Sequence, residues 1–405
     1  MKRLALVLLL ATNLFADPVA DSRKLQREAL EAYKAKDYAT FLAKIRGASD
    51  LRPDHPTLLY YLAGAYTMNG RNDEALSTLE RVARMGMVYE IAEEPDFAPL
   101  RSDKRFEGVA EAFKKNAQPI GKASRAFTTV KGLITEGLAY DGRRFFVGSV
   151  RTGTIRTNDG GTFAGPTGRG VFGLAIDRKR RLVWAATSVI PQHVEFREEN
   201  AGRAAVVAFG LDDGKVRSTF EAPEGKHLFG DLALAPNGDV YISDSTTPAI
   251  YRISAGKLEL FKEGGPFLSL QGLAVRDKTL YVADYSKGIF AIDLATRDAH
   301  LLTSPRDATL LGVDGLYAPA PGILIATQNG VNPHRVIRIA LKGTAVNRVD
   351  TLLANHPDFD EPTLGVIAGR DFYFNAASQF ELYGDRGTAK DESKVREGVV
   401  LRVKW

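Results

Sequence analysis

Gln271-Gly272-Leu273-Ala274 is followed, after a short polar turn, by the apolar run Leu280-Tyr281-Val282. The same order occurs six times: any residue, then Gly or Asp, an apolar pair or near-pair, a turn, and an aromatic or β-branched run. The six steps recur every 36 to 58 residues and begin at Glu136, Phe172, Gly230, Gln271, Asp314 and Leu364. Short apolar runs bounded by turn residues indicate β-strands. The chain after about residue 123 therefore repeats one strand-rich unit.

Each unit has room for two further strands. In the third unit these are expected at residues 249–253 and 258–261. Four short strands in a unit of roughly 40–50 residues are typical of a propeller blade. The sequence therefore predicts a six-bladed β-propeller over residues 123–405.

The two ends of this region predict how the ring closes. Residues 399–403 have the pattern of a third strand in the last blade, and only Lys404-Trp405 follows. Residues 127–130 lie just before the first repeat and would supply the missing fourth strand. A blade shared between the two ends leaves no free sheet edge.

Residues 21–118 have helical periodicity instead, with apolar residues three to four positions apart. Residues 36–42 align with residues 70–76 at an offset of 34, the period of a tetratricopeptide helix pair. The segment resembles two such repeats, and a generic helical bundle is the alternative. Because about three repeats are needed for independent stability, we expect this docking module to pack on the propeller or on a partner. The predicted fold class is thus a short helical-repeat domain followed by an all-β propeller.

Residues 1–16 have the pattern of an export signal, with Lys2-Arg3, an apolar run over 4–10 and a small residue, Ala16, at the expected cleavage point. A buried helix is the alternative. We expect a periplasmic or secreted protein that does not span the membrane after signal removal, since no other apolar run is long enough. The absence of cysteine excludes disulfides, zinc–thiolate sites and thiol nucleophiles. A net charge of +5 over 405 residues is too small to indicate a nucleic-acid partner.

Propeller geometry predicts where functional residues gather. The innermost strand of each blade lines the central channel, so the residue that opens each step should lie at one mouth. The second strand is antiparallel and ends at the same mouth, where it brings Ser149, Thr187, Asp244, Asp284, Gln328, Asn329 and Asn375. Oxygen ligands without His or Cys suit a hard cation such as calcium.

At these residues the chain resembles the senescence-marker-protein, regucalcin and gluconolactonase superfamily of six-bladed propellers. Members of that family hold a divalent cation, usually calcium, at the axis, and many hydrolyse lactones or related esters. The resemblance implies that Glu136 and Asp314 are metal ligands and that Gln271 stands where the family has an Asn. The family's other Asn is missing at Gly230, where the neighbouring Asp231 would fill in.

The same resemblance implies a metal-dependent lactone or ester hydrolase with Asp314 as both ligand and catalytic base. Substrate would be oriented by Asp231, Asp244, Gln328 and His334. The alternatives are structural roles without function: Glu136 and Asp314 would be channel residues around water, Asp244 a turn cap, and His334 a polar loop residue. The altered set of axial residues keeps a second function open, a non-catalytic propeller that binds an envelope protein or glycan.

Overall fold

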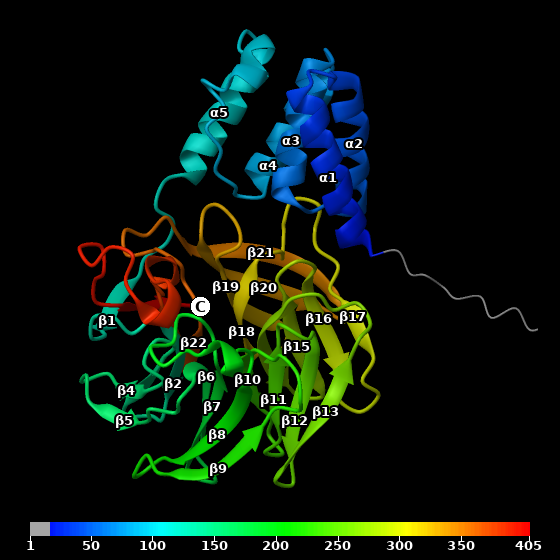
Figure 1. The fold of residues 1–405 in the computed structure, drawn as a ribbon. Coiled ribbons are helices and arrows are strands. Elements are labelled where there is room, and N and C mark those ends of the chain that lie inside the picture. Colours follow the sequence, from blue (N-terminus) through cyan, green and yellow to red (C-terminus); the bar gives the residue numbers. More distant parts are fainter. Residues whose placement is uncertain (1–16) are drawn as a thin grey trace, which may run out of the picture.

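The computed structural model describes residues 17–405, so the predicted export signal lies outside the described residues. The helical part precedes the propeller (Figure 1). Asp17, Asp37 and Asp103 cap their helices by accepting a hydrogen bond from a main-chain N–H of the first turn. The helices are α1 (Pro18–Lys34), α2 (Tyr38–Leu51), α3 (Pro56–Met68), α4 (Asn72–Arg84), the 3₁₀ helix η1 (Pro95–Leu100) and α5 (Lys104–Asn116).

The starts of α2 and α4 lie 34 residues apart, as the repeat alignment predicts. None of the helices within residues 17–405 combines the length and apolar character that crossing a bilayer requires.

The strands that follow the helices form six four-stranded antiparallel sheets, which confirms the predicted six-bladed propeller. From the axis outward, the first three blades are β2–β5 (Thr135–Tyr140, Phe145–Ser149, Ile155–Thr157, Thr162–Ala164), β6–β9 (Gly170–Asp177, Leu182–Ser188, Ala204–Gly210, Val216–Glu221) and β10–β13 (Phe229–Leu234, Val240–Asp244, Ala249–Ser254, Lys257–Glu263). The next two are β14–β17 (Leu270–Arg276, Thr279–Asp284, Gly288–Asp293, Ala299–Leu301) and β18–β21 (Val313–Ala320, Ile323–Gln328, Arg335–Lys342, Ala345–Ala354).

The sixth blade contains both ends of the propeller, as predicted. Its order is β22 (Gly365–Ala368), β23 (Asp371–Asn375), β24 (Val399–Lys404) and, outermost, β1 (Ser124–Thr128). β1 pairs antiparallel with β24, with Thr128 opposite Val399. The closing strand begins three residues earlier than the sequence pattern indicates. Buried apolar side chains between successive blades form the core.

The glycine of the repeated step allows the inner strands to approach each other. A Cβ on Gly137 would lie 1.9 Å from the main-chain oxygen of Phe172 in the next blade. A Cβ on Gly272 would lie 2.3 Å from the main-chain oxygen of Asp314. The repeated glycine is thus a packing requirement at the narrow axis of the ring.

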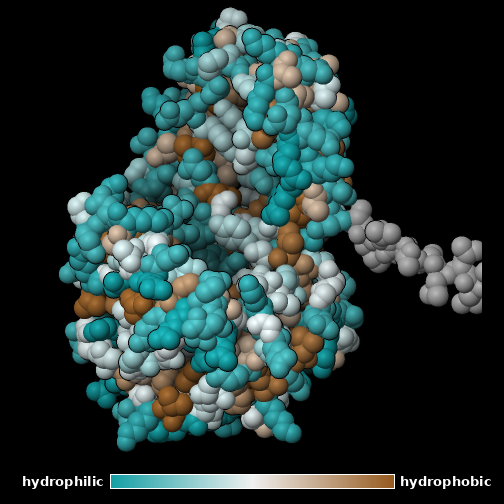
Figure 2. Space-filling model, in the orientation of Figure 1, coloured by the Kyte–Doolittle hydropathy of each residue, from teal (hydrophilic) through white to brown (hydrophobic). Residues whose placement is uncertain are grey.

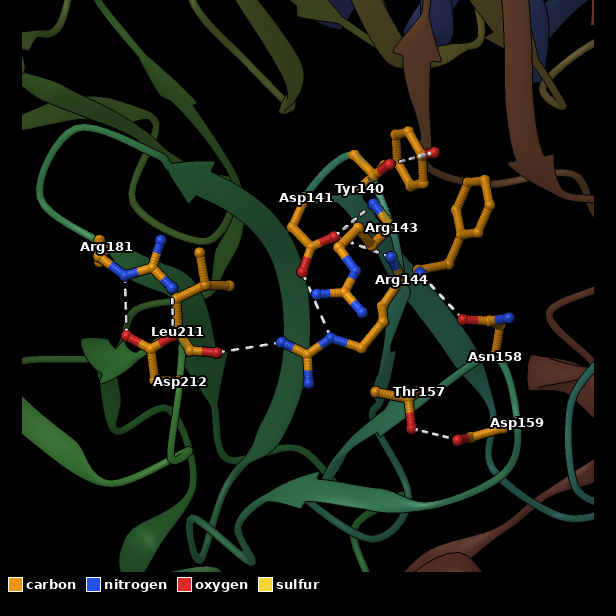
Figure 3. Close-up of polar contacts among 12 residues, drawn as sticks. Tyr140, Asp141, Arg143, Arg144, Thr157, Asn158, Asp159, Arg181, Leu211 and Asp212 are labelled. Atoms are coloured by element: carbon orange, nitrogen blue, oxygen red, sulfur yellow. Dashed lines mark hydrogen bonds and ion pairs between the residues drawn. The ribbon is translucent and has the colours of Figure 1, made fainter.

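Arginines join blades at the hairpin tips on the opposite face from the channel mouth that gathers the polar residues. Arg144 donates to the carbonyl of Leu211 (3.1 Å), and Arg181 pairs with Asp212, as Figure 3 shows. Arg180, also in the basic run over 178–181, donates to the carbonyl of Gly238 (2.5 Å). Part of this run therefore connects hairpins within and between blades.

The helical domain packs on the fourth and fifth blades. Arg52 donates to the carbonyl of Ser286 (2.9 Å), and Val88 and Asn332 exchange two hydrogen bonds of 3.0 Å each. Val331 packs against the helical core around Met85 and Met87. The propeller loops involved follow β15 and β19, so the helices sit on the face where these strands end, as Figure 1 shows.

Candidate functional site

A cavity of about 250 Å³ occupies the mouth of the central channel. We call it the mouth cavity. It is lined by Glu136, Phe172, Leu228, Gly230, Asp231, Gln271, Gly272, Tyr285, Asp314, Asn329, Glu361 and Leu364. The lining includes all six residues that open the repeated steps. Four lining residues carry carboxyl groups, two of them step-opening residues, and none is Lys, Arg or His.

Asp314 is held in place by an amide and a phenol. Asn329 Nδ2 donates to Asp314 Oδ2 (2.8 Å) and to the carbonyl of Pro362 (3.1 Å). Tyr285 donates its hydroxyl proton to Asn329 Oδ1 (3.1 Å), which fixes the orientation of the amide. Asp314 Oδ1 accepts no hydrogen bond within residues 17–405. This oxygen is therefore available to a ligand, a cation or water.

Glu136 faces Asp314 from the first blade. Asn375 Nδ2 donates to the main-chain carbonyl of Glu136 (2.5 Å), which ties the start of β2 to the end of β23. Glu361 joins from the loop before β22, where Ser378 Oγ donates to its carboxyl (3.0 Å). The mouth cavity thus receives carboxyl groups from the first, third, fifth and sixth blades.

Asp231 occupies the position that holds glycine in most of the repeated steps. Its Oδ2 accepts a hydrogen bond from the main-chain N–H of Leu273 in the next blade (3.2 Å). Gly173 in the preceding blade makes room for it, since a Cβ there would lie 2.5 Å from Asp231 Oδ1. Asp231 therefore bridges neighbouring inner strands and also lines the cavity.

Burial in this acidic environment raises the pKa of three carboxyl groups. Burial, and then repulsion from Asp314 and Glu361, raises the pKa of Glu136 well above its usual value. Burial also raises the pKa of Asp314 to about 7, with Glu361 adding to the effect, and that of Asp231 to about 7, with Asp314 adding. Asp231 and Asp314 are therefore partly protonated at neutral pH when no positive charge compensates them.

We predict that the protein in chelator, without any bound cation, loses stability as the pH rises. Because the folded carboxyls of Asp231 and Asp314 have pKa values of about 7, the folded state binds more protons than the unfolded chain between about pH 4 and pH 7. The free energy of unfolding should fall across that window. Thermal unfolding in chelator at pH 5 and pH 8 measures this, and Asp231→Asn should reduce the difference. An equal pH dependence in both proteins would contradict the prediction.

The mouth cavity brings together only some of the residues for which the sequence predicts a role. Glu136, Gln271, Asp314 and Asp231 line it, whereas Asp244, Gln328 and His334 do not. Asp244 is buried and acts as the turn cap of the alternative interpretation: Oδ1 accepts from three main-chain N–H groups, and Oδ2 from His227 Nδ1. His334 donates Nδ1–H to the carbonyl of Asp360 (2.5 Å).

Gln328 is buried beneath the cavity instead of lining it. Its Nε2 donates to the carbonyls of Thr309 (3.0 Å) and Leu311 (2.7 Å), and its Oε1 accepts from Arg335. Every polar atom of the side chain is therefore used within the protein. The structure gives Gln328 a supporting role in place of the predicted contact with substrate.

Two polar lining residues, Tyr285 and Glu361, have no predicted role in the sequence, whereas Asn329 is expected at this mouth and lines the cavity. Tyr285 follows directly on Asp284 at the end of β15, so the end of the second strand points to it within one residue. Glu361 lies three residues before the sixth step, in a loop that strand periodicity does not place.

The donor set of the mouth cavity fits a hard cation in its chemistry. Within residues 17–405, no three His, Cys, Asp or Glu side chains form a compact metal-binding cluster. A cation would therefore draw on amide as well as carboxylate oxygens. Gln271 Nε2 donates to Ser269 Oγ (3.4 Å), and its Oε1 accepts no hydrogen bond from the part of the chain that the structure describes. Buried carboxyls without a cationic side chain among them either keep their protons or, once ionised, have their charge neutralised by a bound cation.

The helical domain lies beside the mouth cavity, on loops that contribute residues to its lining. Figure 2 shows a hollow between the helical domain and the propeller, with hydrophilic surface around much of it. Tyr285 and Asn329 belong to the two propeller loops on which the helices pack. The helical domain is thus adjacent to the polar mouth.

No family model matches the chain, and no curated protein matches it. Among solved structures, the PQQ-bound aldose sugar dehydrogenase of Streptomyces coelicolor is 18% identical, with a TM-score of 0.48, over 71% of this chain and all of that one. A glucose dehydrogenase-like protein of Thermus thermophilus is also 18% identical, with a TM-score of 0.48, over 70% of this chain and 99% of its own.

A calcium-binding regucalcin of Agrobacterium tumefaciens is 12% identical, with a TM-score of 0.48, over 69% of this chain and 95% of its own. These values carry no argument about activity. The strand order of this chain itself shows the propeller.

Proposed function

We propose that the protein is a cation-dependent hydrolase that acts on a lactone or related ester in the mouth cavity. The observation that supports this most strongly is the set of four carboxyl groups around a cavity of about 250 Å³ whose lining contains no cationic side chain. When these carboxyl groups ionise, an oxygen-ligated cation such as calcium would neutralise their charge.

Glu136 and Asp314 would hold the cation, with Gln271 Oε1 as an amide ligand. When bound, the cation supplies electrostatic polarisation of the substrate carbonyl and of the charge that develops on its oxygen. Asp231 and Glu361 lie around the same space and would contact substrate hydroxyls or water.

The protein's own residues account for the proton transfers. Asp314 accepts a proton from water as the water oxygen bonds to the carbonyl carbon of the substrate. The carbon–oxygen bond of the lactone or ester then breaks, and the leaving oxygen takes that proton. Asn329 and Tyr285 hold Asp314 in one orientation throughout, so no hydrogen bond has to rearrange during the reaction. The expected export signal would place the activity in the periplasm or outside the cell.

Elemental analysis and a substrate panel test the proposal. Purified protein should contain a divalent cation, and lactones or esters should be hydrolysed at a rate that falls to background in chelator and returns with added calcium. Absence of bound metal together with no hydrolysis, or hydrolysis unaffected by chelator, would overturn the proposed function.

A second candidate is the non-catalytic binding propeller. The observation that favours it is the helical domain packed beside the polar mouth, where a protein or glycan could contact both parts of the chain. Under this alternative, the full chain would capture an envelope component, and the Glu136→Ala, Asp314→Ala double variant would capture it equally well.

A further inference from the structure

Arg335 is an unusual residue at the junction of the two domains. The residue is only 3% exposed, and it has no carboxylate partner within residues 17–405. Burial lowers the pKa of its guanidinium to about 10. A buried cation without a counter-ion lowers the stability of the folded protein unless its donors are hydrogen-bonded. The partners of the Arg335 guanidinium therefore indicate what the residue does.

The hydrogen bonds of Arg335 connect the helical domain to the wall of the mouth cavity. Its Nη1 donates to the carbonyl of Met85, just after α4 (2.9 Å), and its Nε donates to Gln328 Oε1 (2.6 Å). Gly86 allows this approach, because a Cβ there would lie 2.9 Å from Arg335 Nη1 and its φ of +77° disfavours other residues.

Gln328, which accepts from Arg335, contacts the backbone before Asp314 and lies next to the residue that binds the Asp314 carboxyl group. It holds the carbonyls of Thr309 and Leu311, which directly precede the strand that begins at Val313. It also immediately precedes Asn329, whose amide donates to Asp314 Oδ2. One side chain therefore fixes both the backbone that presents Asp314 and the residue that orients its carboxyl group.

The second loop of the cavity wall is held by the same domain. Arg52 donates to the carbonyl of Ser286, and Arg23 to its hydroxyl (3.3 Å). The neighbouring Tyr285 donates to Asn329, and its main-chain oxygen accepts from the N–H of Gly312 (2.8 Å). The helical domain thus forms hydrogen bonds with both of the loops, after β15 and after β19, that contribute Tyr285 and Asn329 to the cavity.

We propose that Arg335 is a positioning residue through which the helical domain holds Asn329 and Asp314 in binding geometry. The inference rests on the proposed function for its effect on cation binding, and it makes the helical domain a structural part of the site. Outer-shell partners of metal ligands commonly change metal affinity by about 10- to 100-fold when removed.

The test uses the full chain with two variants that each disturb the contact between Arg335 and the Met85 carbonyl, one from the propeller and one from the helical domain. Arg335→Met keeps much of the length of the side chain and removes its donors. Gly86→Ala places a methyl group against Arg335 Nη1. The matched control is Arg84→Ala, which removes the exposed Arg84–Asp307 ion pair (2.9 Å) at the same domain boundary. Calcium titration calorimetry, hydrogen exchange by mass spectrometry and thermal unfolding are measured for each protein.

We expect both variants to bind calcium at least about tenfold more weakly and to exchange faster at residues 284–288 and 328–332, with the first three blades unchanged. Arg84→Ala should remain within about twofold of the natural protein. Unchanged exchange in both loops, or an equal effect of Arg84→Ala, would overturn the positioning role, as would faster exchange spread evenly over the propeller. If the natural protein binds no cation, the proposed function fails, and the exchange measurement still decides whether Arg335 holds the loops.

Discussion

Replacing Glu136 and Asp314 together by their amides, Glu136→Gln and Asp314→Asn, should abolish cation binding and lower kcat/KM for lactone or ester hydrolysis by about 1000-fold or more. Both substitutions keep the shape of the side chains. They remove the two negative charges that would hold the cation and the base that accepts a proton from water. Calcium calorimetry and initial rates on the best substrate of the panel measure the two effects.

Folding failure would not explain this loss. Burial, and then repulsion from the neighbouring carboxyls, raises the pKa of Glu136, and uncharged amides remove both unfavourable effects. The metal-free double variant should therefore unfold at a temperature at least as high as that of the metal-free natural protein at pH 8. The control variant, Glu224→Gln with Asp298→Asn, changes two exposed acids in the same way and should leave binding and rate unchanged. Full activity in the Glu136→Gln, Asp314→Asn variant would contradict the proposed mechanism.

Gly137→Ala should destabilise the propeller more than any exposed substitution. The added methyl would lie 1.9 Å from the Phe172 main-chain oxygen and 2.9 Å from Leu174 Cγ, so two inner strands would have to separate. Overpacking of this kind costs about 3 kcal/mol, which corresponds to a fall of roughly 10 °C in Tm for a domain of this size. Thermal and urea unfolding followed by circular dichroism measure the change.

Gly108→Ala provides the matched control. Gly108 lies in α5 with no atom within 4 Å of an added Cβ, so the substitution should be neutral or should stabilise the helix by up to about 1 kcal/mol. If Gly137→Ala unfolds at the same temperature as the natural protein, the close approach of the inner strands does not govern stability.

The propeller could be predicted in detail because its repeated steps carry a packing requirement that is visible in the sequence. Gly137 and Gly272 stand where neighbouring backbones nearly touch, and the apolar pair that follows enters the core between blades. The return of the second strand to the same mouth also follows from the pattern, since the start of each first strand pairs with the end of the second, Thr135 with Ser149 and Leu270 with Asp284. The predicted closure was also confirmed, since the strand before the first repeat pairs with the last strand of the chain. In a closed ring, the incomplete last blade is the one position where that strand can pair.

The site could be predicted only in part, because the direction of a side chain at a strand end depends on the loop that follows. Asp244 and Gln328 end their strands at the correct mouth, but both turn into the protein and hold main-chain groups. The next residue, Asn329, enters the cavity instead. Glu361 comes from a loop, and the contact of Arg335 with Met85 joins positions 250 residues apart. Neither follows from a local pattern.

Crystals of the protein soaked in calcium, with data collected for anomalous scattering, would locate the cation directly. The account predicts one peak in the mouth cavity, about 2.3–2.6 Å from carboxylate oxygens of Glu136 and Asp314. Calcium found only outside the mouth cavity, or only water between these two carboxylates at saturating calcium, would contradict it.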